Sequence, residues 1–330
     1  MHLTRHLNVA VCGAGAFGQN HLRIYRELMR SGAPITLAAI VESNPSAADA
    51  LHLEWQVPVF GSVAECLHVT QHLDAASVCV PTSAHHAVAQ ALLLSGVDVL
   101  VEKPIAATAE EASELVLLAK AHQRILQPGH LERFNPAVTA IRPFLNHPMF
   151  FEAHRLSIFS PRSLDVDVVL DLMIHDLDIV LSFVQSPVQS IHAVGLPVLS
   201  QKSDIANVRI EFESGCVANF TASRVSTERV RKLRFFQPHQ YVSIDYARQD
   251  LLLIDVSPEP VASPALKIEK PAVIPGEPLR LEIESFLQSV CDRTIPAVTA
   301  HDGARALQLA LDINAAIAAH ADRAGLRRFL

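Results

Sequence analysis

The hydrophobic residues in the first part of the chain, up to about residue 145, form short runs separated by segments of helical period. The strand-like runs are Asn8–Cys12, Ile35–Val41, Ala76–Val80 and Val97–Val101, with Arg124–Phe134 as one more expected strand. Between them, apolar residues recur every three or four positions in Gln19–Arg30, Ala84–Leu94 and Ala109–His122. Strands that alternate with helices indicate βαβ units and a parallel sheet.

The pattern changes after Met149. One long apolar helix is predicted at Val166–Val184. The segments that follow alternate polar and apolar residues, as in "NVRIEFESG", "CVANFTASRVS", "KLRFFQPHQ" and "YVSIDYARQDLLLIDV", which is typical of an antiparallel sheet. Two helices, Leu279–Arg293 and His301–Arg323, are expected at the end.

These patterns predict an α/β protein with two domains. Residues 1–145 form a doubly wound parallel sheet, and residues 146–330 form an α/β domain with an open, largely antiparallel sheet. The last helices can pack back on the first domain.

Composition excludes several classes of protein. The chain has 330 residues, of which 50% are hydrophobic, and a net charge of −7, whereas nucleic-acid and membrane-surface binders are usually basic. No apolar run approaches the roughly 18 residues of a membrane span. The cysteines are Cys12, Cys66, Cys79, Cys216 and Cys291. An odd number without metal-type spacing indicates reduced thiols, and a strand expected from Leu7 leaves no room for a signal peptide, so we expect a cytoplasmic protein.

The first chemical motif is "LNVAVCGAGAFGQNHL", which carries Gly13, Gly15 and Gly18 in G-x-G-x-x-G spacing. It follows a strand and opens a helix, which is the context of a dinucleotide-binding Rossmann fold. The first glycine permits a tight turn, the second lets the backbone approach a pyrophosphate, and the third allows close helix packing. We expect these glycines, with Ala16 and Phe17 between them, to contact the cofactor.

The second strand ends at Glu42, where the fold places an acid that hydrogen-bonds the ribose hydroxyls of the adenosine. A carboxylate there repels a 2′-phosphate, and no Lys or Arg occurs from Val41 to Phe60 to receive one. The predicted cofactor is therefore NAD rather than NADP.

Two further strand tips are expected at the cofactor, because ligands of such sheets lie beyond the carboxyl ends of the strands. Their residues are Pro81, Thr82 and His85 after one strand, and Glu102, Lys103 and Pro104 after the next. For His85, a position on the helix surface is an equal alternative. Partial burial and a neighbouring acid can tune Lys103 for proton transfer.

The apolar helix "LDVDVVLDLMIHDLDIVLSFV" carries a stripe of Asp167, Asp171, His175, Asp178 and Ser182 at steps of three or four residues. Acids and a histidine are costly to bury without partners, so the stripe marks a solvated face or the wall of a site. Asp171 can orient the ring of His175 for acid–base chemistry near neutral pH. A metal shared by Asp171, His175 and Asp178 is an alternative, but no metal is expected, because a dinucleotide already supplies redox chemistry.

Three segments, "VCGAGAFGQNH", "VEKPIA" and "DLMIHDLD", together resemble the glucose–fructose oxidoreductase/inositol dehydrogenase/rhizopine catabolism (Gfo/Idh/MocA) family over the whole chain. The resemblance implies an NAD-binding Rossmann domain and a second domain whose open sheet builds homodimers or homotetramers. It also implies that Lys103, Asp171 and His175 fall on catalytic positions and contact substrate. His175, or Lys103 through a relay, would then remove a proton from a sugar hydroxyl.

A narrower resemblance, carried by "GHLERFNPAV" and "SRVSTERVRKLRFFQPHQYVSIDY", is to bacterial UDP-N-acetylglucosamine 3-dehydrogenases. It implies a 3-keto sugar nucleotide as product, a downstream aminotransferase, and a 3-amino sugar of lipid A as the end point. Arginine binds diphosphate in bidentate fashion. The candidate cations are Arg133, Arg155, Arg162, Arg224, Arg229, Arg231, Lys232 and Arg234. Arg133 and Arg162, with Asn135, are the expected substrate contacts.

Two alternatives to a sugar-nucleotide dehydrogenase remain from the sequence. One is a dehydrogenase of a free sugar or polyol such as inositol, against which the arginine supply argues mildly. The other is a ligand-sensing regulator that keeps the fold without catalysis, against which the intact set of Lys103, Asp171 and His175 argues. In each case we expect a small-molecule ligand and neither nucleic acid nor membrane as partner.

Overall fold

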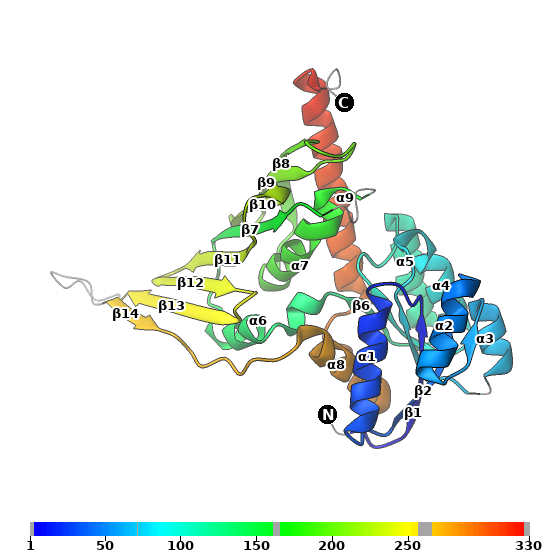
Figure 1. Cartoon of the computed structure of the whole chain (residues 1–330). Coiled ribbons are helices and arrows are strands. Elements are labelled where there is room, and N and C mark those ends of the chain that lie inside the picture. The colour runs from blue at the N-terminus through cyan, green and yellow to red at the C-terminus, as the bar shows by residue number, and fades with distance from the viewer. Residues whose placement is uncertain (1–2, 71, 161–165, 257–265, 327–330) are drawn as a thin grey trace. The chain divides into compact units, whose positions relative to one another are not determined.

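The computed structural model describes residues 3–70, 72–160, 166–256 and 266–326. The chain packs as two units (Figure 1), the first made of Met1–Leu131 and Leu279–Leu307, the second of Glu132–Pro278 and Gln308–Leu330. The division therefore falls earlier than residue 145, where the sequence pattern placed it. The reason is local, because Glu132 and Arg133 form ion pairs within the second unit.

The first unit is built on a six-stranded parallel sheet with the order β3-β2-β1-β4-β5-β6. Its strands are β1 Leu7–Cys12, β2 Ile35–Val41, β3 Val59–Phe60, β4 Ala75–Val78, β5 Asp98–Glu102 and β6 Leu126–Gly129. The connecting helices are α1 Gly18–Arg30, α2 Pro45–Trp55, α3 Val63–Val69, α4 Thr82–Leu94 and α5 Ala109–Ala121. The order reverses between β1 and β4, so the carboxyl ends of these strands form the topological switch point.

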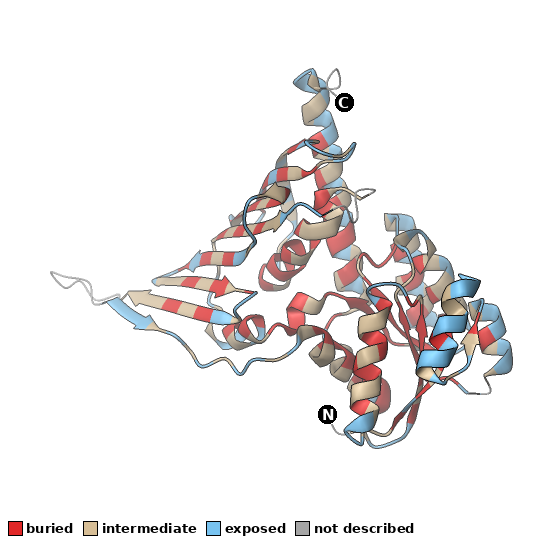
Figure 2. Cartoon of the chain, viewed as in Figure 1, coloured by how far each residue is buried: buried red, intermediate tan, exposed pale blue. Residues whose placement is uncertain are grey.

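Valine, isoleucine, leucine and alanine fill these strands and are buried along almost their whole length (Figure 2), as in a sheet covered on both faces. Two parts of the pattern differ from expectation. The short strand β3 lacked a clear signal, since two residues carry no periodicity. Of the expected strand Arg124–Phe134, only the part that forms β6 is a strand. The segment Leu131–Phe134 is the 3₁₀ turn η1.

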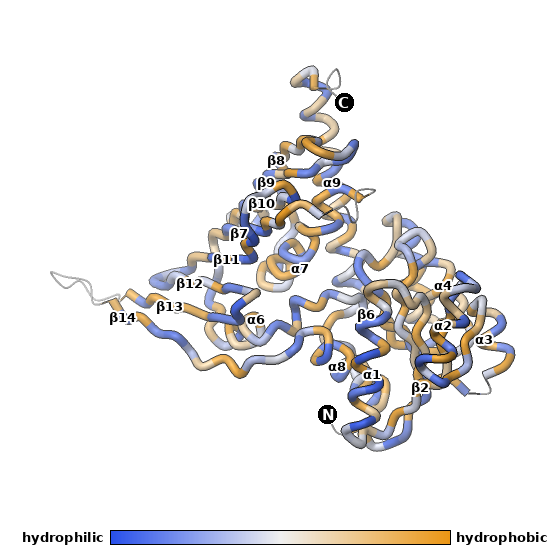
Figure 3. Tube along the Cα trace, viewed as in Figure 1, coloured by the Kyte–Doolittle hydropathy of each residue, from blue (hydrophilic) through white to orange (hydrophobic). Residues whose placement is uncertain are grey.

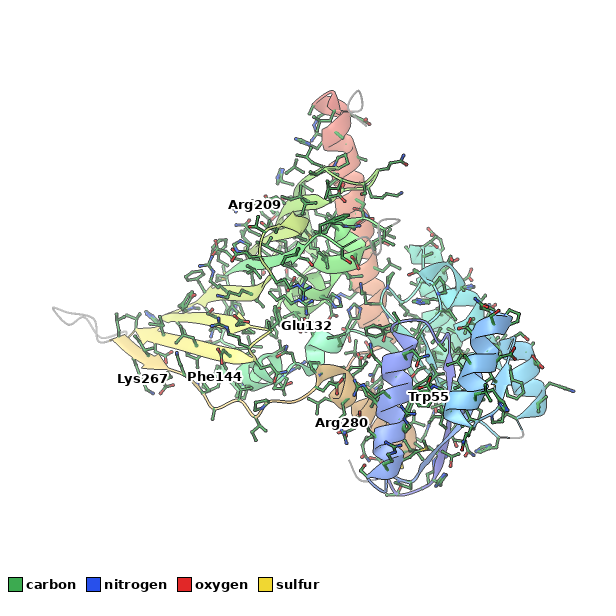
Figure 4. The ribbon with its side chains drawn as sticks, in the orientation of Figure 1. Trp55, Glu132, Phe144, Arg209, Lys267 and Arg280 are labelled. Atoms are coloured by element: carbon green, nitrogen blue, oxygen red, sulfur yellow. The ribbon has the colours of Figure 1, made fainter. Side chains whose placement is uncertain are left out.

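Helix α8, Pro278–Asp292, belongs to the first unit although it lies near the end of the chain. Its apolar face, including Ile283 and Phe286, joins the core formed by β1 and α1. Arg280 of α8, labelled in Figure 4, reaches Glu27 of α1 at 3.5 Å and Glu284 at 2.9 Å. Helix α9, Ala300–Arg323, begins in the first unit and ends in the second.

The second unit contains an eight-stranded sheet in the order β14-β13-β12-β11-β7-β10-β9-β8, parallel only between β7 and β10. Its strands are β7 Phe150–Ile158, β8 Val188–Leu196, β9 Ile205–Phe212, β10 Val217–Ser226, β11 Val230–Gln237, β12 Gln240–Asp245, β13 Asp250–Val256 and β14 Leu266–Glu269. The other elements are α6 Pro136–Ile141, the 3₁₀ turn η2 Arg142–Phe144, the π-helical turn η3 Val169–Met173 and α7 Ile174–Phe183.

The open sheet keeps the period-2 pattern that antiparallel strands require (Figure 3). One face is buried, and there the Phe151 ring lies 5.2 Å from that of Phe235 and 6.4 Å from that of Phe183 of α7. The alternate residues on the other face are half-buried or exposed. The sequence pattern did not single out β7 and β8. No helix within the described residues is long and apolar enough to cross a membrane.

Candidate active site

The glycine motif lies between β1 and α1, and each glycine meets a different constraint. Gly13 has φ +87°, and a Cβ there would lie 2.7 Å from the backbone nitrogen of Val80. A Cβ on Gly18 would lie 1.9 Å from the Gly13 carbonyl oxygen, whereas one on Gly15 meets nothing within 4 Å. Two glycines are thus required by packing, and the third leaves open space beside the backbone.

The start of α1 fits a dinucleotide pyrophosphate. No side chain caps the helix, and its first turn carries no acidic residue. Ala16 and Phe17 are exposed, Phe17 to 38%. The positive end of the helix dipole therefore lies at the glycine loop without a carboxylate to oppose it, which is where such folds bind phosphate. These features satisfy the requirements of an NAD site.

Glu42 lies at the tip of β2, directly beside the glycine loop. Its carboxylate accepts hydrogen bonds from the backbone N–H of Ala14 at 3.1 Å and of Asn44 at 2.9 Å. The side chain is half-buried, and its oxygens retain lone pairs for further donors. An acid at this strand tip is the residue type that hydrogen-bonds a ribose in dinucleotide-binding folds.

At the tip of β4, Pro81 is exposed and Thr82 begins α4. His85, one turn later, is buried rather than on the helix surface. Its Nδ1 lies 2.8 Å from the Pro104 carbonyl oxygen and its Nε2 2.9 Å from that of Val80. Burial lowers the pKa of His85. With both ring nitrogens facing carbonyls, the side chain ties the tips of β4 and β5 together, which argues against the expected cofactor contact.

Lys103 follows the last residue of β5 and is half-buried, and the Lys103–Pro104 peptide is cis. Glu102 before it is 8% exposed, and its Oε1 lies 2.9 Å from Nε2 of His21 on α1. Pro104 is buried. The segment is thus held from two sides, by His21 through Glu102 and by His85 through Pro104.

The polar stripe predicted on one helix runs through two kinds of helix, and of its members only Asp178 is buried. The π-helical turn η3 widens the helix before α7 begins, which changes the angular step between residues. Asp167 caps the turn by accepting from the N–H of Val169 and Leu170. Asp171 within the turn and His175 in the first turn of α7 are both half-buried. Segments of π-helix occur frequently at functional sites.

Asp178 of the same stripe is buried and accepts from Arg133, with Nε to Oδ2 at 2.6 Å and Nη2 to Oδ1 at 2.9 Å. A carboxylate occupied in this way does not favour the shared metal considered above for Asp171 and His175. Arg133 itself is 7% exposed. Its role in this structure is to hold α7 against the η1 turn, and the geometry does not support the expected diphosphate contact.

Asn135 is likewise 2% exposed and fully engaged. Its Oδ1 accepts from the Ala137 N–H as the cap of α6, while Nδ2 donates to Glu132 and to the Tyr246 carbonyl oxygen. Both N–H donors of the amide are thus used within the protein, and the buried side chain is not exposed to a substrate. Arg162, the third expected substrate contact, lies outside the residues that the structure describes.

Most other candidate cations of the second unit also have carboxylate partners. Arg155 is buried and donates hydrogen bonds from Nε and Nη2 to Asp176. Its Nη1 donates to Glu132, which is labelled in Figure 4. Arg234 lies 3.0 Å from a carboxylate oxygen of Glu152. The remaining pairs are Arg224–Asp204 and Lys232–Asp245, both at 3.8 Å.

Arg231 differs from these residues. Within the described part of the chain it has no carboxylate at ion-pair distance, and it is exposed. Arg231 pairs with Arg155 in the register of β11 and β7, so both side chains leave the same face of the sheet, the face covered by α7. Partial desolvation and the adjacent Arg155 charge lower the pKa of Arg231, against the opposing effect of Glu132 and Asp176. The sequence did not rank it above its neighbours, because the pairing of the other cations is tertiary.

The comparisons with known proteins agree with this architecture. Residues 7–130 match the oxidoreductase family with an NAD-binding Rossmann fold, and residues 140–237 match the GFO/IDH/MocA C-terminal domain. UDP-N-acetylglucosamine 3-dehydrogenase of Acidithiobacillus ferrooxidans is 33% identical over 320 residues, which are 96% of this chain and 99% of that protein. Its solved structure superposes with a TM-score of 0.86 over 95% of this chain and 98% of that chain, at 32% identity.

Other relatives match less of the chain or only its fold. Inositol 2-dehydrogenase/D-chiro-inositol 3-dehydrogenase of Shouchella clausii is 29% identical over 180 residues, 52% of this chain and 51% of that protein. A levoglucosan dehydrogenase in complex with NADH and L-sorbose has a TM-score of 0.84 at 17% identity, covering 96% of this chain and 97% of that one. At that identity the likeness concerns the fold alone.

Proposed function

Because the chain belongs to the Gfo/Idh/MocA family of NAD-binding oxidoreductases, we propose that it is an NAD-dependent dehydrogenase acting on C3 of UDP-N-acetylglucosamine. The observation that carries the proposal is the similarity to a UDP-N-acetylglucosamine 3-dehydrogenase over 96% of this chain and 99% of that relative. The inositol dehydrogenase of Shouchella clausii covers 52% of the chain. A free polyol is therefore the weaker alternative.

The cofactor contacts follow from the first unit. We assign the pyrophosphate to the loop residues Gly13, Gly15, Ala16, Phe17 and Gly18. Glu42 binds the adenosine ribose, and Pro81, Thr82 and Lys103 contact the rest of the cofactor. Glu102, His85 and Pro104 support this edge from behind, since their polar groups are hydrogen-bonded within the protein.

The catalytic roles rest on the family motifs. Bound NAD supplies a hydride acceptor at C4 of its nicotinamide ring. The proton of the sugar hydroxyl passes to His175, or to Lys103, and the carbon becomes a ketone. Asp171 orients the imidazole and stabilises its protonated form. The retained Lys103, Asp171 and His175 favour an enzyme over a non-catalytic regulator.

For the substrate diphosphate we propose Arg231 as the principal partner in the described residues. It lies on the face of the sheet that α7 covers, next to the buried pair of Arg155 and Asp176, and has no carboxylate at ion-pair distance in the described residues. The guanidinium can therefore form a bidentate, charge-assisted contact with a diphosphate. Arg162 remains a second candidate from the sequence.

We further propose a homodimer or homotetramer assembled through the open face of the eight-stranded sheet. On that face the rings of Phe150 and Phe236 stack 5.7 Å apart, and Tyr241 lies 5.2 Å from Phe236. Phe236 is 39% exposed. An aromatic cluster at a half-covered sheet surface is typical of a subunit interface.

The product of this reaction, a 3-keto sugar nucleotide, is a substrate for an aminotransferase that would install a 3-amino group for lipid A. We place these steps in the cytoplasm, because Cys12, Cys66, Cys79, Cys216 and Cys291 are all free thiols, as is usual in a reducing compartment.

The test is formation of NADH by the purified protein with UDP-N-acetylglucosamine, with a carbonyl trap to draw the ketone equilibrium forward. Myo-inositol and free glucose serve as alternative substrates, and the Lys103→Met variant as the inactive control. NADH formed with inositol or glucose but not with the nucleotide sugar would transfer the assignment to a polyol dehydrogenase.

A further inference from the structure

Three side chains of the first unit, far apart in sequence, meet behind the glycine loop. His21 comes from α1, Cys79 follows β4, and Glu102 ends β5. One ring nitrogen, the thiol sulfur and one carboxylate oxygen all lie within 4.8 Å of one another. Imidazole, thiolate and carboxylate are the ligands that Zn²⁺ takes from proteins, and three protein ligands leave the fourth position for water.

The cluster is built inside the protein rather than on its surface. His21 is 0% exposed and Glu102 8%, while Cys79 is half-buried. Nδ1 of His21 has no hydrogen-bond partner within the described residues, although Nε2 lies 2.9 Å from Glu102. A buried ring nitrogen without a partner is unusual in native proteins, and a ligand is one explanation for it.

The charges in the cluster are arranged for a cation. Burial raises the pKa of the Cys79 thiol well above its usual value, and the Glu102 carboxylate raises it further. A divalent ion offsets both effects, because it attracts the thiolate and neutralises the carboxylate. Together, one thiolate and one carboxylate balance the charge of one divalent ion.

The position of the cluster connects it with dinucleotide binding. A Cβ on Gly18 would lie 3.5 Å from Cβ of Cys79, and one on Gly13 would lie 2.8 Å from the Cys79 carbonyl oxygen. A glycine also packs against the Glu102 member of the cluster, since a Cβ on Gly129 would lie 3.0 Å from the Glu102 carboxylate. The backbone of the cofactor loop is therefore in direct contact with the residue that carries the thiol.

We propose that His21, Cys79 and Glu102 form a site for a thiophilic divalent cation such as Zn²⁺, and that its occupation excludes NAD. On binding, the thiol S–H bond breaks, the sulfur–metal bond forms and the proton leaves to solvent, with no change of oxidation state. Ligands about 2.0–2.3 Å from zinc lie roughly 3.5 Å apart in tetrahedral geometry. A donor pair at the 4.8 Å limit must close by about 1 Å, and a shift of Cys79 disturbs its close contact with Gly13.

The direct test uses Co²⁺ as a spectroscopic probe of the apo protein. One equivalent should produce a thiolate-to-cobalt charge-transfer band and the visible spectrum of a tetrahedral ion, and Zn²⁺ should abolish both. Cys79→Ala should remove the band and weaken Co²⁺ binding by at least about tenfold. The matched control, Cys66→Ala, alters another buried thiol of the same unit and should leave the spectrum unchanged.

A second measurement links the site to the cofactor, through NADH fluorescence at increasing Zn²⁺. The parent protein and Cys66→Ala should lose NADH affinity in proportion to bound zinc, whereas Cys79→Ala should bind NADH normally and ignore the metal. The chain has 17 histidines, and some of them can bind zinc weakly at the surface. These variants distinguish such binding from binding at the cluster, because only Cys79→Ala removes a ligand of the cluster. A cobalt band that persists in Cys79→Ala, or NADH affinity unchanged at saturating zinc, would overturn the proposal.

Discussion

The glycine loop of the first unit and the π-turned helix of the second position their chemistry by opposite means. The shape of the loop depends on the backbone, since Gly13 and Gly18 permit contacts that no side chain would allow. In the second unit, side chains hold the helix in place. Arg133 and Arg155 are buried and anchor α7 through Asp178 and Asp176. Burial alone would lower the pKa of Arg155, but Asp176 and Glu132 raise it overall.

This difference determines which substitutions should disrupt each region. A site built from backbone is destroyed by adding one carbon atom where the chain packs closely. A site held by buried ion pairs tolerates a change of shape but not the loss of one partner, because the remaining charge stays buried without compensation.

The largest effect is expected from Gly18→Ala, because its Cβ would lie 1.9 Å from the Gly13 carbonyl oxygen. The loop must open, and NAD binding measured by calorimetric titration should fall below detection. Gly15→Ala is the control, since its Cβ meets nothing within 4 Å of the protein. Gly15→Ala should keep the melting temperature of the parent protein while weakening its binding of NAD. Normal NAD affinity in Gly18→Ala would contradict a backbone-built site.

The next effect concerns catalysis in both units. Lys103→Met and His175→Ala should each lower turnover by about 10²–10⁴ if they take part in proton transfer. NAD binding should survive, because the Gly13–Gly18 loop is unchanged. Turnover with the nucleotide sugar, measured beside NAD titration and melting temperature, separates these outcomes. Near-normal turnover in both variants, or loss of the fold in either, would show that these groups are structural.

Removing one member of the buried pair tests the anchoring of α7. Asp178→Ala should lower the free energy of unfolding by about 3–5 kcal/mol, because it leaves the Arg133 charge buried. The double variant Arg133→Met/Asp178→Leu should recover most of this loss, since neither charge is then buried. Denaturant unfolding checks both. If Arg133→Ala instead raised the KM for the nucleotide sugar at unchanged stability, Arg133 would be a substrate residue after all.

A smaller effect is expected for the uncompensated cation. Arg231→Ala should raise the KM for UDP-N-acetylglucosamine about tenfold, in line with the loss of one charged hydrogen bond, and leave turnover and melting temperature unchanged. A diphosphate remote from the reacting carbon binds alike in ground and transition states. Arg234→Ala is the matched control, because it lies on the opposite face of β11 and pairs with Glu152. Equal KM changes in both variants would rule out a specific contact by Arg231.

The smallest effect should come from Glu42. Glu42→Ala removes the carboxylate beside the ribose and should reduce the preference for NAD over NADP, mainly by admitting the 2′-phosphate. Dissociation constants of both cofactors, measured for parent and variant, give the ratio. A parent protein that binds NADP as tightly as NAD would refute the role of Glu42.

Much of the fold could be predicted from local pattern. The parallel sheet follows from apolar runs such as Ile35–Val41 separated by amphipathic helices, and the antiparallel sheet from alternation such as Ile205–Phe212. The strand β3 and the π-turn η3 could not be predicted, since a two-residue strand has no period and a helical sequence does not reveal one widened turn. The division of the chain at Leu131 depends on contacts between residues far apart in the sequence, which carry no sequence signal.

The sequence by itself determined the features that a single residue type enforces. Glycine at positions 13 and 18 and an acid at Glu42 have one physical explanation each within a Rossmann fold, and the structure accommodates all of them. Only the tertiary structure decided which charges are available. The sequence favoured Arg133 over Arg231 as a substrate contact, but Arg133 is buried against Asp178, whereas Arg231 has no carboxylate at ion-pair distance in the described residues. Coulombic pairing depends on distance in space, which the order of residues does not contain.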